Sequence, residues 1–282
     1  MNIRDLYVIN SRGEREPFSV GKVYRGLRKS GVEKELAKKI TKIIQKEAFP
    51  GIRTSEIAKR IGKFLFKEFP REAIKFNLKE GMLKLGPTGF LFEKYIGEIF
   101  SDLGYKVKLN LKLQGASSAR YEIDFLAKKP LAPFGGKRCE VYLGECKYHR
   151  QVGGRVDLGI ALMNYARYLD LKKPLMKTII VTNTKFTSQA IKYSEYQGVS
   201  LLGWRYPKKR GLETLIAKRN LYPITILPSL KPELKNIFVQ DGKILARDIL
   251  KISPQKFSKK HKIPLWKLQK LIKEAKILLG LT

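Results

Sequence analysis

Two acidic residues and a lysine are spaced in a way that suits hydrolytic chemistry. Asp124 lies between the apolar residues Ile123 and Phe125, and the segment Gly144-Glu145-Cys146-Lys147 follows about twenty residues later. Side chains two positions apart on a β-strand share a face, so we expect Glu145 and Lys147 to point together and Cys146 to point away. If Asp124 lies on a neighbouring strand, with Ile123 and Phe125 facing the core, two carboxylates and an ammonium group meet at one place.

This grouping of charges suits a hydrated divalent cation next to an attacking water. The expected cation is Mg²⁺, or alternatively Mn²⁺. Mg²⁺ prefers oxygen ligands and keeps several of its waters. A bound cation neutralises charge on a phosphate and makes its water more acidic, which is what hydrolysis of a phosphodiester needs. Lys147 would orient that water or help to deprotonate it. The alternative is a salt bridge on an exposed strand, because two acids and a lysine at such a spacing are common by chance.

The net charge of the chain points to a polyanionic partner. Lys and Arg number 58 against 25 Asp and Glu, which gives a formal net charge of +33. Such an excess repels itself in a folded chain unless a polyanion neutralises part of it, so nucleic acid, and DNA in particular, is the expected partner. The alternative, a lysine-rich surface of the thermophilic kind, would carry matching glutamates.

Length and composition exclude several other classes of protein. The 282 residues, 43% of them hydrophobic, are enough for two or so domains with real cores. No apolar run is long enough to span a bilayer, and Met1–Asn10 lacks the apolar core of a signal peptide, so we expect a cytoplasmic protein without membrane association. Two cysteines provide neither a disulfide framework nor a four-cysteine zinc site. His149 and His261 are too far apart in sequence to indicate a histidine-based metal site.

The elements that must position these residues are predicted in three segments. Residues 1–86 read as a small β-hairpin followed by helices, including Arg71–Leu83, and residues 223–282 as a small basic helical region. Residues 87–222 alternate between the two periodicities, which predicts a mixed β-sheet flanked by helices and an α/β (α+β) fold class. Its predicted strands are Tyr105–Leu113, Tyr121–Ala127, Glu140–Tyr148, Lys177–Thr182 and Val199–Trp204; its predicted helices are Phe90–Leu103, Val156–Leu169 and Thr187–Gln197. We expect Trp204 and Trp266 to be core residues.

The middle segment resembles a known nuclease superfamily. Phe92-Glu93, Glu122-Ile123-Asp124, Gly144-Glu145-Cys146-Lys147 and Val181-Thr182-Asn183 match the PD-(D/E)xK nucleases, most closely Mrr-type restriction endonucleases and archaeal Holliday-junction resolvases. The resemblance implies that Asp124, Glu145 and the carbonyl of Cys146 bind the metal and that Lys147 is catalytic. It also implies an auxiliary acid, Glu93, with Glu98 as its rival. The first motif departs from the family pattern, since Glu122-Ile123-Asp124 stands where Pro-Asp is usual.

The first segment resembles the ATP-cone, a nucleotide-binding regulatory domain of ribonucleotide reductases and of their transcriptional repressor. The matching residues include Glu16-Pro17-Phe18-Ser19, Lys22-Val23 and Gly51–Ile57. The resemblance implies that ATP or dATP binds in a pocket lined by Val8, Glu16, Lys22 and Thr54, with Lys22 at the phosphates. Asn10-Ser11 replaces the usual Lys-Arg of the family, and Arg12 is the candidate to take over their charge.

Basic residues next to the candidate site and near the C-terminus are the candidate contacts to nucleic acid. They are His149, Arg150, Arg155, Lys256, Lys259 and Lys260, and ordinary surface roles are the alternative for each.

Together, the three segments favour the hypothesis of a Mg²⁺-dependent DNA endonuclease that acts on branched or modified DNA and is regulated through the ATP-cone. The alternative is a nucleotide-sensing DNA-binding regulator without cleavage activity, although the reductase repressor needs four cysteines for its zinc ribbon and this chain has two. Because enzymes of this type often cut both strands as dimers, a homodimer is left open.

Overall fold

The computed structural model describes residues 6–29, 31–86, 89–130, 139–151, 153–172 and 175–281. The chain divides into two units: unit 1 is Met1–Met82 together with Ile224–Thr282, and unit 2 is Leu83–Pro223. Unit 2 is thus inserted between two parts of unit 1. Helices flank mixed sheets, as the predicted α/β fold class requires.

Unit 2 is built on a five-stranded sheet with the order β10-β8-β6-β5-β4. The strands are β4 (Lys106–Gln114), β5 (Arg120–Pro130), β6 (Cys139–Lys147), β8 (Met176–Thr182) and β10 (Ser200–Leu202). Pairing is antiparallel from β4 through β6 and parallel from β6 through β10. The apolar run of β8 is buried between the two neighbouring strands β6 and β10.

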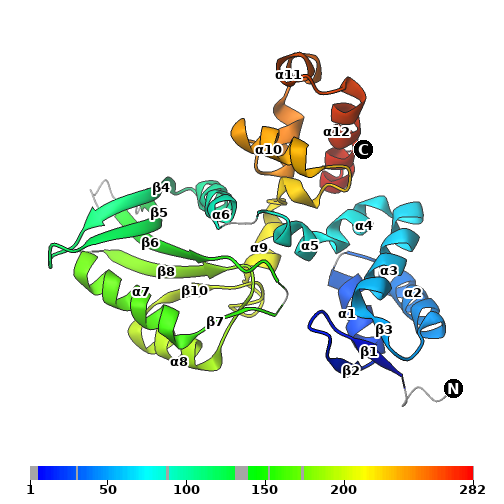
Figure 1. Ribbon diagram of the computed structural model, residues 1–282, viewed down its shortest axis with the longest axis horizontal. Helices are drawn as coiled ribbons and strands as arrows, with labels where there is room; N and C mark the ends of the chain where they lie inside the picture. Colours follow the sequence, from blue (N-terminus) through cyan, green and yellow to red (C-terminus); the bar gives the residue numbers. More distant parts are fainter. Residues whose placement is uncertain are drawn as a thin grey trace. The chain divides into compact units, whose positions relative to one another are not determined.

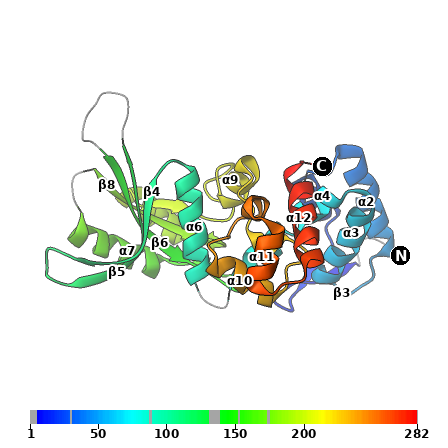
Figure 2. The same cartoon turned by 90° about the horizontal axis from the view of Figure 1, so that it is seen from above.

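Helices cover both faces of this sheet (Figures 1 and 2). Helix α6 (Phe90–Asp102) packs on β4 and β5, and α7 (Leu158–Leu171) and α8 (Ser188–Gln197) lie side by side over the opposite face. A small two-stranded sheet of β7 (Arg155–Val156) and β9 (Lys185–Phe186), and helix α9 (Leu212–Arg219), complete the unit. Trp204 is buried here as predicted.

The first part of unit 1 is a small sheet with a helical layer. Strands β1 (Tyr7–Ile9), β2 (Arg15–Pro17) and β3 (Ile52–Arg53) pair in the order β2-β1-β3. The helices are α1 (Val20–Lys29), α2 (Lys34–Glu47), α3 (Thr54–Glu68), α4 (Pro70–Phe76) and α5 (Leu78–Leu83). The single helix predicted over Arg71–Leu83 is wrong: the N–H of Asn77 bonds back to Ile74 and Lys75 and ends α4. Asn is a poor residue for a helix interior and favours such ends.

The C-terminal part of unit 1 is helical, as predicted. It contains α10 (Pro232–Gln240), α11 (Pro254–His261), α12 (Leu265–Leu279) and two 3₁₀ turns, η2 (Ile224–Ile226) and η3 (Ala246–Lys251). Pro254 is the first residue of α11 and Pro264 is the N-cap residue of α12, and at both positions a backbone N–H would have no partner within the helix. Trp266 on α12 is exposed, so its prediction as a core residue is wrong; it stands in the first turn of the helix, before the buried residues from Leu268 onward.

The two ends of the chain pack together in unit 1. The hydroxyl of Thr225 donates to the carbonyl of Gly81 at 2.7 Å, and Arg71 Nε donates to the carbonyl of Leu278 at 3.3 Å. A Cβ on Gly81 would lie 2.9 Å from Ile226 Cα, so the close approach needs glycine. The ends of unit 2 fall within a few residues of the boundaries predicted near 86 and 222. The division into three domains stays a prediction.

Candidate active site and nucleotide pocket

The sheet of unit 2 is distorted at Asp124. The β4–β5 pairing runs on both sides of this residue but skips it, and Asn110 opposite has a left-handed φ of 53°. On the other edge, the β5–β6 pairing ends at Phe125 and Gly144. The carboxylate of Asp124 accepts the backbone N–H of Cys146 at 2.6 Å. Strands β5 and β6 therefore stop pairing at Asp124, and a side chain replaces the main-chain acceptor. We call this place the strand fork.

The distortion also separates two buried residues of β5. Ile123 and Phe125 are both buried, as predicted. However, Ile123 packs with Leu143 and Leu171 of α7, whereas the Phe125 ring packs on Phe100 of α6 at 4.8 Å between centroids. A regular strand would place both side chains on one face, and this chain does not keep the two-residue period through Asp124.

Glu145 lies at the strand fork between two cations. Its Oε1 is 2.6 Å from Lys147 Nζ, so these side chains point together as predicted, and the Cys146 side chain is buried. Its Oε2 is 2.6 Å from Nη1 of Arg167 on α7, which also donates to the carbonyl of Glu122 at 3.2 Å. The side chain of Glu145 is 6% exposed, that of Arg167 18% and that of Lys147 32%. A buried carboxylate needs such partners, since an unpaired charge in this position is costly.

Glu93 on α6 belongs to the same electrostatic group. Burial, followed by the negative charges of Asp124 and Glu145, raises the pKa of Glu93 to about 7, and Lys147 opposes the rise. Burial and Glu145 likewise raise the pKa of Asp124 to about 6, against the hydrogen bond from Cys146. Glu98 is five residues further along the same helix, about 140° around it. Glu93 is thus coupled to Asp124 and Glu145, and its role as the auxiliary acid stays a prediction.

The donors at the strand fork fit a hydrated divalent cation. In the part of the chain that the structure describes, no three Asp, Glu, His or Cys side chains form a ligand cluster. Asp124 and Glu145 supply two carboxylates here, and Mg²⁺ commonly binds proteins through one or two carboxylates while keeping its waters. The metal-ligand roles of Asp124, Glu145 and the Cys146 carbonyl stay predictions. Burial first, and neighbouring negative charge second, raise the pKa values of Asp124 and Glu93, and a bound cation would favour their ionised forms.

Arg167 is the residue at this site that sequence reasoning missed. It lies outside the matched motifs, and only the packing of α7 on the sheet brings it to Glu145. A lone arginine in an otherwise uncharged stretch, Leu158–Leu169, was the available signal.

The segment after β6 holds three predicted contacts to nucleic acid. The backbone of His149 exchanges two hydrogen bonds with the Asn183 side chain, and its Nδ1 lies 3.0 Å from the Thr184 hydroxyl. Its ring packs so closely on Gly154 that an added Cβ there would lie 2.5 Å away. Arg150 and Arg155 are exposed. The arrangement fits an anchoring role for His149, and the DNA contacts of all three stay predictions.

The other three predicted contacts lie on α11 in unit 1. Lys256 and Lys259 are exposed. Lys260 pairs with Asp241 at 3.0 Å, and His261 lies 3.0 Å from the same carboxylate. Part of the charge of this helix is thus neutralised within the protein.

The four residues predicted to bind nucleotide line one cavity in unit 1. Val8, Glu16, Lys22 and Thr54 surround a space of about 190 Å³ together with apolar side chains such as Phe76. Val8 and Glu16 face each other across β1 and β2, and Thr54 begins α3 directly after β3. The short sheet therefore collects residues from three sequence regions at one pocket.

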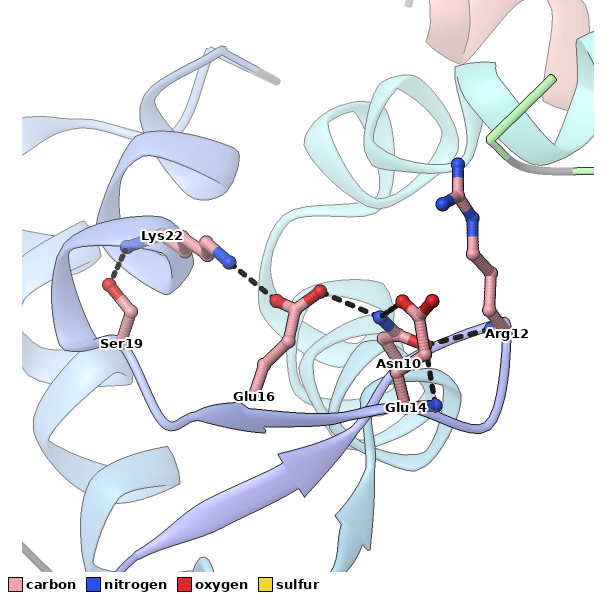
Figure 3. A network of polar contacts seen from close by, with 6 residues as sticks. All are labelled: Asn10, Arg12, Glu14, Glu16, Ser19 and Lys22. Atoms are coloured by element: carbon pink, nitrogen blue, oxygen red, sulfur yellow. Dashed lines mark hydrogen bonds and ion pairs between the residues drawn. The ribbon is translucent and has the colours of Figure 1, made fainter.

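A polar network at this pocket holds Lys22 (Figure 3). Lys22 Nζ donates to Glu16 at 2.7 Å, and Asn10 Nδ2 donates to Glu16 at 2.7 Å and to Glu14 at 2.8 Å. These contacts, first those from Lys22 and Asn10, lower the pKa of Glu16. The Arg12 side chain extends away from the network, while its backbone N–H bonds to Asn10. Asn10 thus binds two carboxylates here, and Lys22 is paired with Glu16.

Comparisons with known proteins agree with this geometry. Family models match the chain at residues 6–78 (ATP cone domain), 87–204 (restriction endonuclease) and 222–279 (AF1548-like, C-terminal). The chain is 33% identical to an uncharacterized protein of Archaeoglobus fulgidus over 186 residues, which are 66% of this chain and all of that protein.

Solved structures give the same relationship. The crystal structure of AF1548, a protein of unknown function, is similar with a TM-score of 0.57 and 32% identity, over 69% of this chain and all of that one. The MspJI restriction endonuclease in complex with a 27-mer oligonucleotide is 17% identical with a TM-score of 0.32, over 58% of this chain and 31% of that one, which is too remote to inform the fold. The chain therefore belongs to the AF1548-like family and carries an ATP-cone domain followed by a restriction endonuclease domain of the Mrr type.

Proposed function

We propose that this protein is a Mg²⁺-dependent endonuclease that hydrolyses phosphodiester bonds in DNA. The observation that carries the proposal is the strand fork, where Asp124, Glu145 and Lys147 converge from β5 and β6. The restriction endonuclease match over residues 87–204 and the net charge of +33 support the same substrate class. Mn²⁺ is expected to replace Mg²⁺.

Each residue at the strand fork has a role in the proposed hydrolysis. Asp124, Glu145 and the carbonyl of Cys146 hold the cation, which supplies charge neutralisation and a more acidic water when bound. Lys147, a third exposed, orients the attacking water and stabilises charge on the phosphate. Glu93 is the auxiliary acid. Arg167 is a positioning residue, because it holds the Glu145 carboxylate against the sheet.

The test is cleavage of defined DNA by the full chain. Supercoiled plasmid, a four-way junction and single strands are incubated with and without Mg²⁺, and each again with ATP or dATP. We expect Mg²⁺-dependent nicking, strongest on branched or modified DNA. Binding without cleavage on every substrate would instead support a DNA-binding regulator, the alternative that the pairing of Glu145 with two cations favours.

The nucleotide pocket carries the regulatory part of the proposal. Val8, Glu16, Lys22 and Thr54 line the cavity, and the ATP cone match covers residues 6–78. A ligand that binds only the folded protein raises its unfolding temperature. We expect ATP or dATP to do so, and Lys22→Ala to reduce the shift. No shift at millimolar nucleotide would leave this domain without a nucleotide ligand.

A cytoplasmic location remains part of the proposal. Among the described residues, none of the helices combines the length and the hydropathy that crossing a bilayer requires.

A further inference from the structure

The small two-stranded sheet of β7 and β9 presents two cations side by side. In the register of this parallel pair, Arg155 lies beside Lys185, and Val156 lies beside Phe186. Val156 and Phe186 are buried in the core that α7 and α8 share, whereas Arg155 and Lys185 are exposed. Because successive residues of a strand point to opposite sides, both cations lie on the outer side of this small sheet. We call Arg155 and Lys185 the cation pair.

The protein does not neutralise the cation pair with acids of its own. In the part of the chain that the structure describes, neither side chain forms an ion pair. The nearest acid in sequence, Asp157, accepts the N–H of Ile160 at 3.1 Å and so caps α7. Two neighbouring like charges repel each other, and an anion bound between them would relieve this repulsion. Other cations of unit 2 do pair with acids: Lys177 with Glu140, Arg205 with Glu213 and Arg219 with Asp102.

The cation pair is close to Lys147 along the strands. Thr182 of β8 lies beside Lys147 of β6 in the parallel register, and its hydroxyl donates to the Lys147 carbonyl at 2.6 Å. Lys185 follows Thr182 by three residues, which span at most about 11 Å. The long side chains of Lys147 and Lys185 therefore extend from neighbouring points of the same sheet end.

A chain of hydrogen bonds also connects Lys147 with the segment that leads to Arg155. Because the Thr182 hydroxyl gives its proton to a carbonyl, the Thr184 hydroxyl 3.0 Å away donates to Thr182. Thr184 Oγ1 then accepts from His149 Nδ1, also at 3.0 Å. The His149 ring packs on the residue that precedes Arg155. Both threonines are buried, so this chain of contacts fixes the small sheet relative to Lys147.

We propose that the cation pair binds a phosphate of the DNA backbone one or two nucleotides from the phosphate that meets Lys147. This inference rests on the proposed function, in which Lys147 contacts the DNA at the cleaved phosphate. A guanidinium and an ammonium group on adjacent strands can donate to one phosphate together. A phosphate held there would orient the backbone at Lys147. Such a contact carries no sequence information, so it contributes affinity and register only.

The test is DNA binding by the full chain without metal, measured by fluorescence anisotropy with a duplex at several salt concentrations. The double variant Arg155→Gln, Lys185→Gln should bind at least about tenfold more weakly at about 150 mM salt. The slope of log affinity against log salt should become shallower by about two phosphate contacts. Arg155→Lys keeps the charge and should keep most of the affinity.

A second like-charge pair in unit 2 provides the matched control. Lys106 and Lys128 lie opposite each other on β4 and β5, and both are exposed. Lys128 pairs with Val141 of β6, which is six residues before Lys147 and thus about 20 Å away along the strand. The double variant Lys106→Gln, Lys128→Gln removes the same charge and should bind DNA like the wild type.

The unfolding temperature separates a binding role from a structural one. Because the cation pair is exposed and its members repel each other, the Arg155, Lys185 double variant should unfold at the wild-type temperature or above it. Wild-type DNA affinity in this variant would overturn the proposal, and so would an equal loss of affinity in the two double variants. Since binding is measured without metal, the expected loss together with a wild type that never nicks DNA would support the cation pair and contradict the proposed hydrolysis.

Discussion

At the scale of single residues, the candidate site depends on how a buried carboxylate is neutralised. Glu145 is almost fully buried and holds one cation on each of its oxygens, Lys147 from its own strand and Arg167 from α7. Lys147 was predictable, because a two-residue spacing on a strand places it beside Glu145. Arg167 was not, because its partner is 22 residues away in sequence and is reached only after α7 packs on the sheet.

Removing Arg167 should destabilise unit 2. Arg167→Met leaves Glu145 buried with one cation, and breaking such a pair costs roughly 3 kcal/mol. We expect urea unfolding to show a loss of this size. The matched control is Arg167→Lys, which keeps the charge and should lose distinctly less. Equal stability of Arg167→Met and the wild type would show that the contact does not hold the Glu145 carboxylate in place.

At the scale of elements, the strands of unit 2 were largely predictable and their distortion was not. Alternating apolar residues predicted β4, β5 and β6 to within a few residues. Strict alternation would place Ile123 and Phe125 on one face, and the left-handed Asn110 and the end of pairing at Phe125 interrupt that alternation. Interruptions of this kind depend on how the strands pack against each other. The two-residue period of the sequence carries no information about that packing.

Gly144 should be intolerant of a side chain, because it marks the end of the β5–β6 pairing. A Cβ there would lie 2.0 Å from the Phe125 ring, which is itself fully buried against α6. We expect Gly144→Ala to lower the free energy of unfolding by about 1–3 kcal/mol, the usual cost of overpacking. Gly159→Ala serves as control, since an added Cβ at that exposed position of α7 makes an ordinary 3.4 Å contact. Thermal or urea unfolding of both variants measures this difference. Equal stability of the two variants would show that the Phe125 ring can move aside at no cost in free energy.

At the scale of the whole molecule, sequence periodicity predicted the order of elements but not which ends of the chain pack together. The first and last segments form one unit through contacts such as Thr225 to Gly81. These residues are 144 positions apart, and neither belongs to a motif. The cavity lined by Val8, Glu16, Lys22 and Thr54 was predictable through family resemblance alone, because its four residues come from separate regions of the sequence.

The charge of the whole molecule predicts how DNA binding responds to salt. Each neutralised phosphate releases counterions, so six or more contacts reduce affinity by about a thousandfold or more between about 50 and 200 mM salt. We expect this steep dependence in fluorescence anisotropy with duplex DNA. The double variant Lys256→Gln, Lys259→Gln should reduce the slope of log affinity against log salt by the equivalent of about two phosphate contacts, if α11 contacts the DNA backbone as predicted. A flat response of the wild type would contradict a nucleic-acid partner.

Nicking of supercoiled plasmid in Mg²⁺, with DNA binding measured on the same samples, tests the central claim most directly. The wild type should nick, and Asp124→Asn and Lys147→Ala should lose nicking by orders of magnitude while binding DNA as before. Glu98→Gln should remain active if Glu93 is the auxiliary acid. Undiminished cleavage by either the Asp124 or the Lys147 variant would contradict the assignment of hydrolysis to the strand fork.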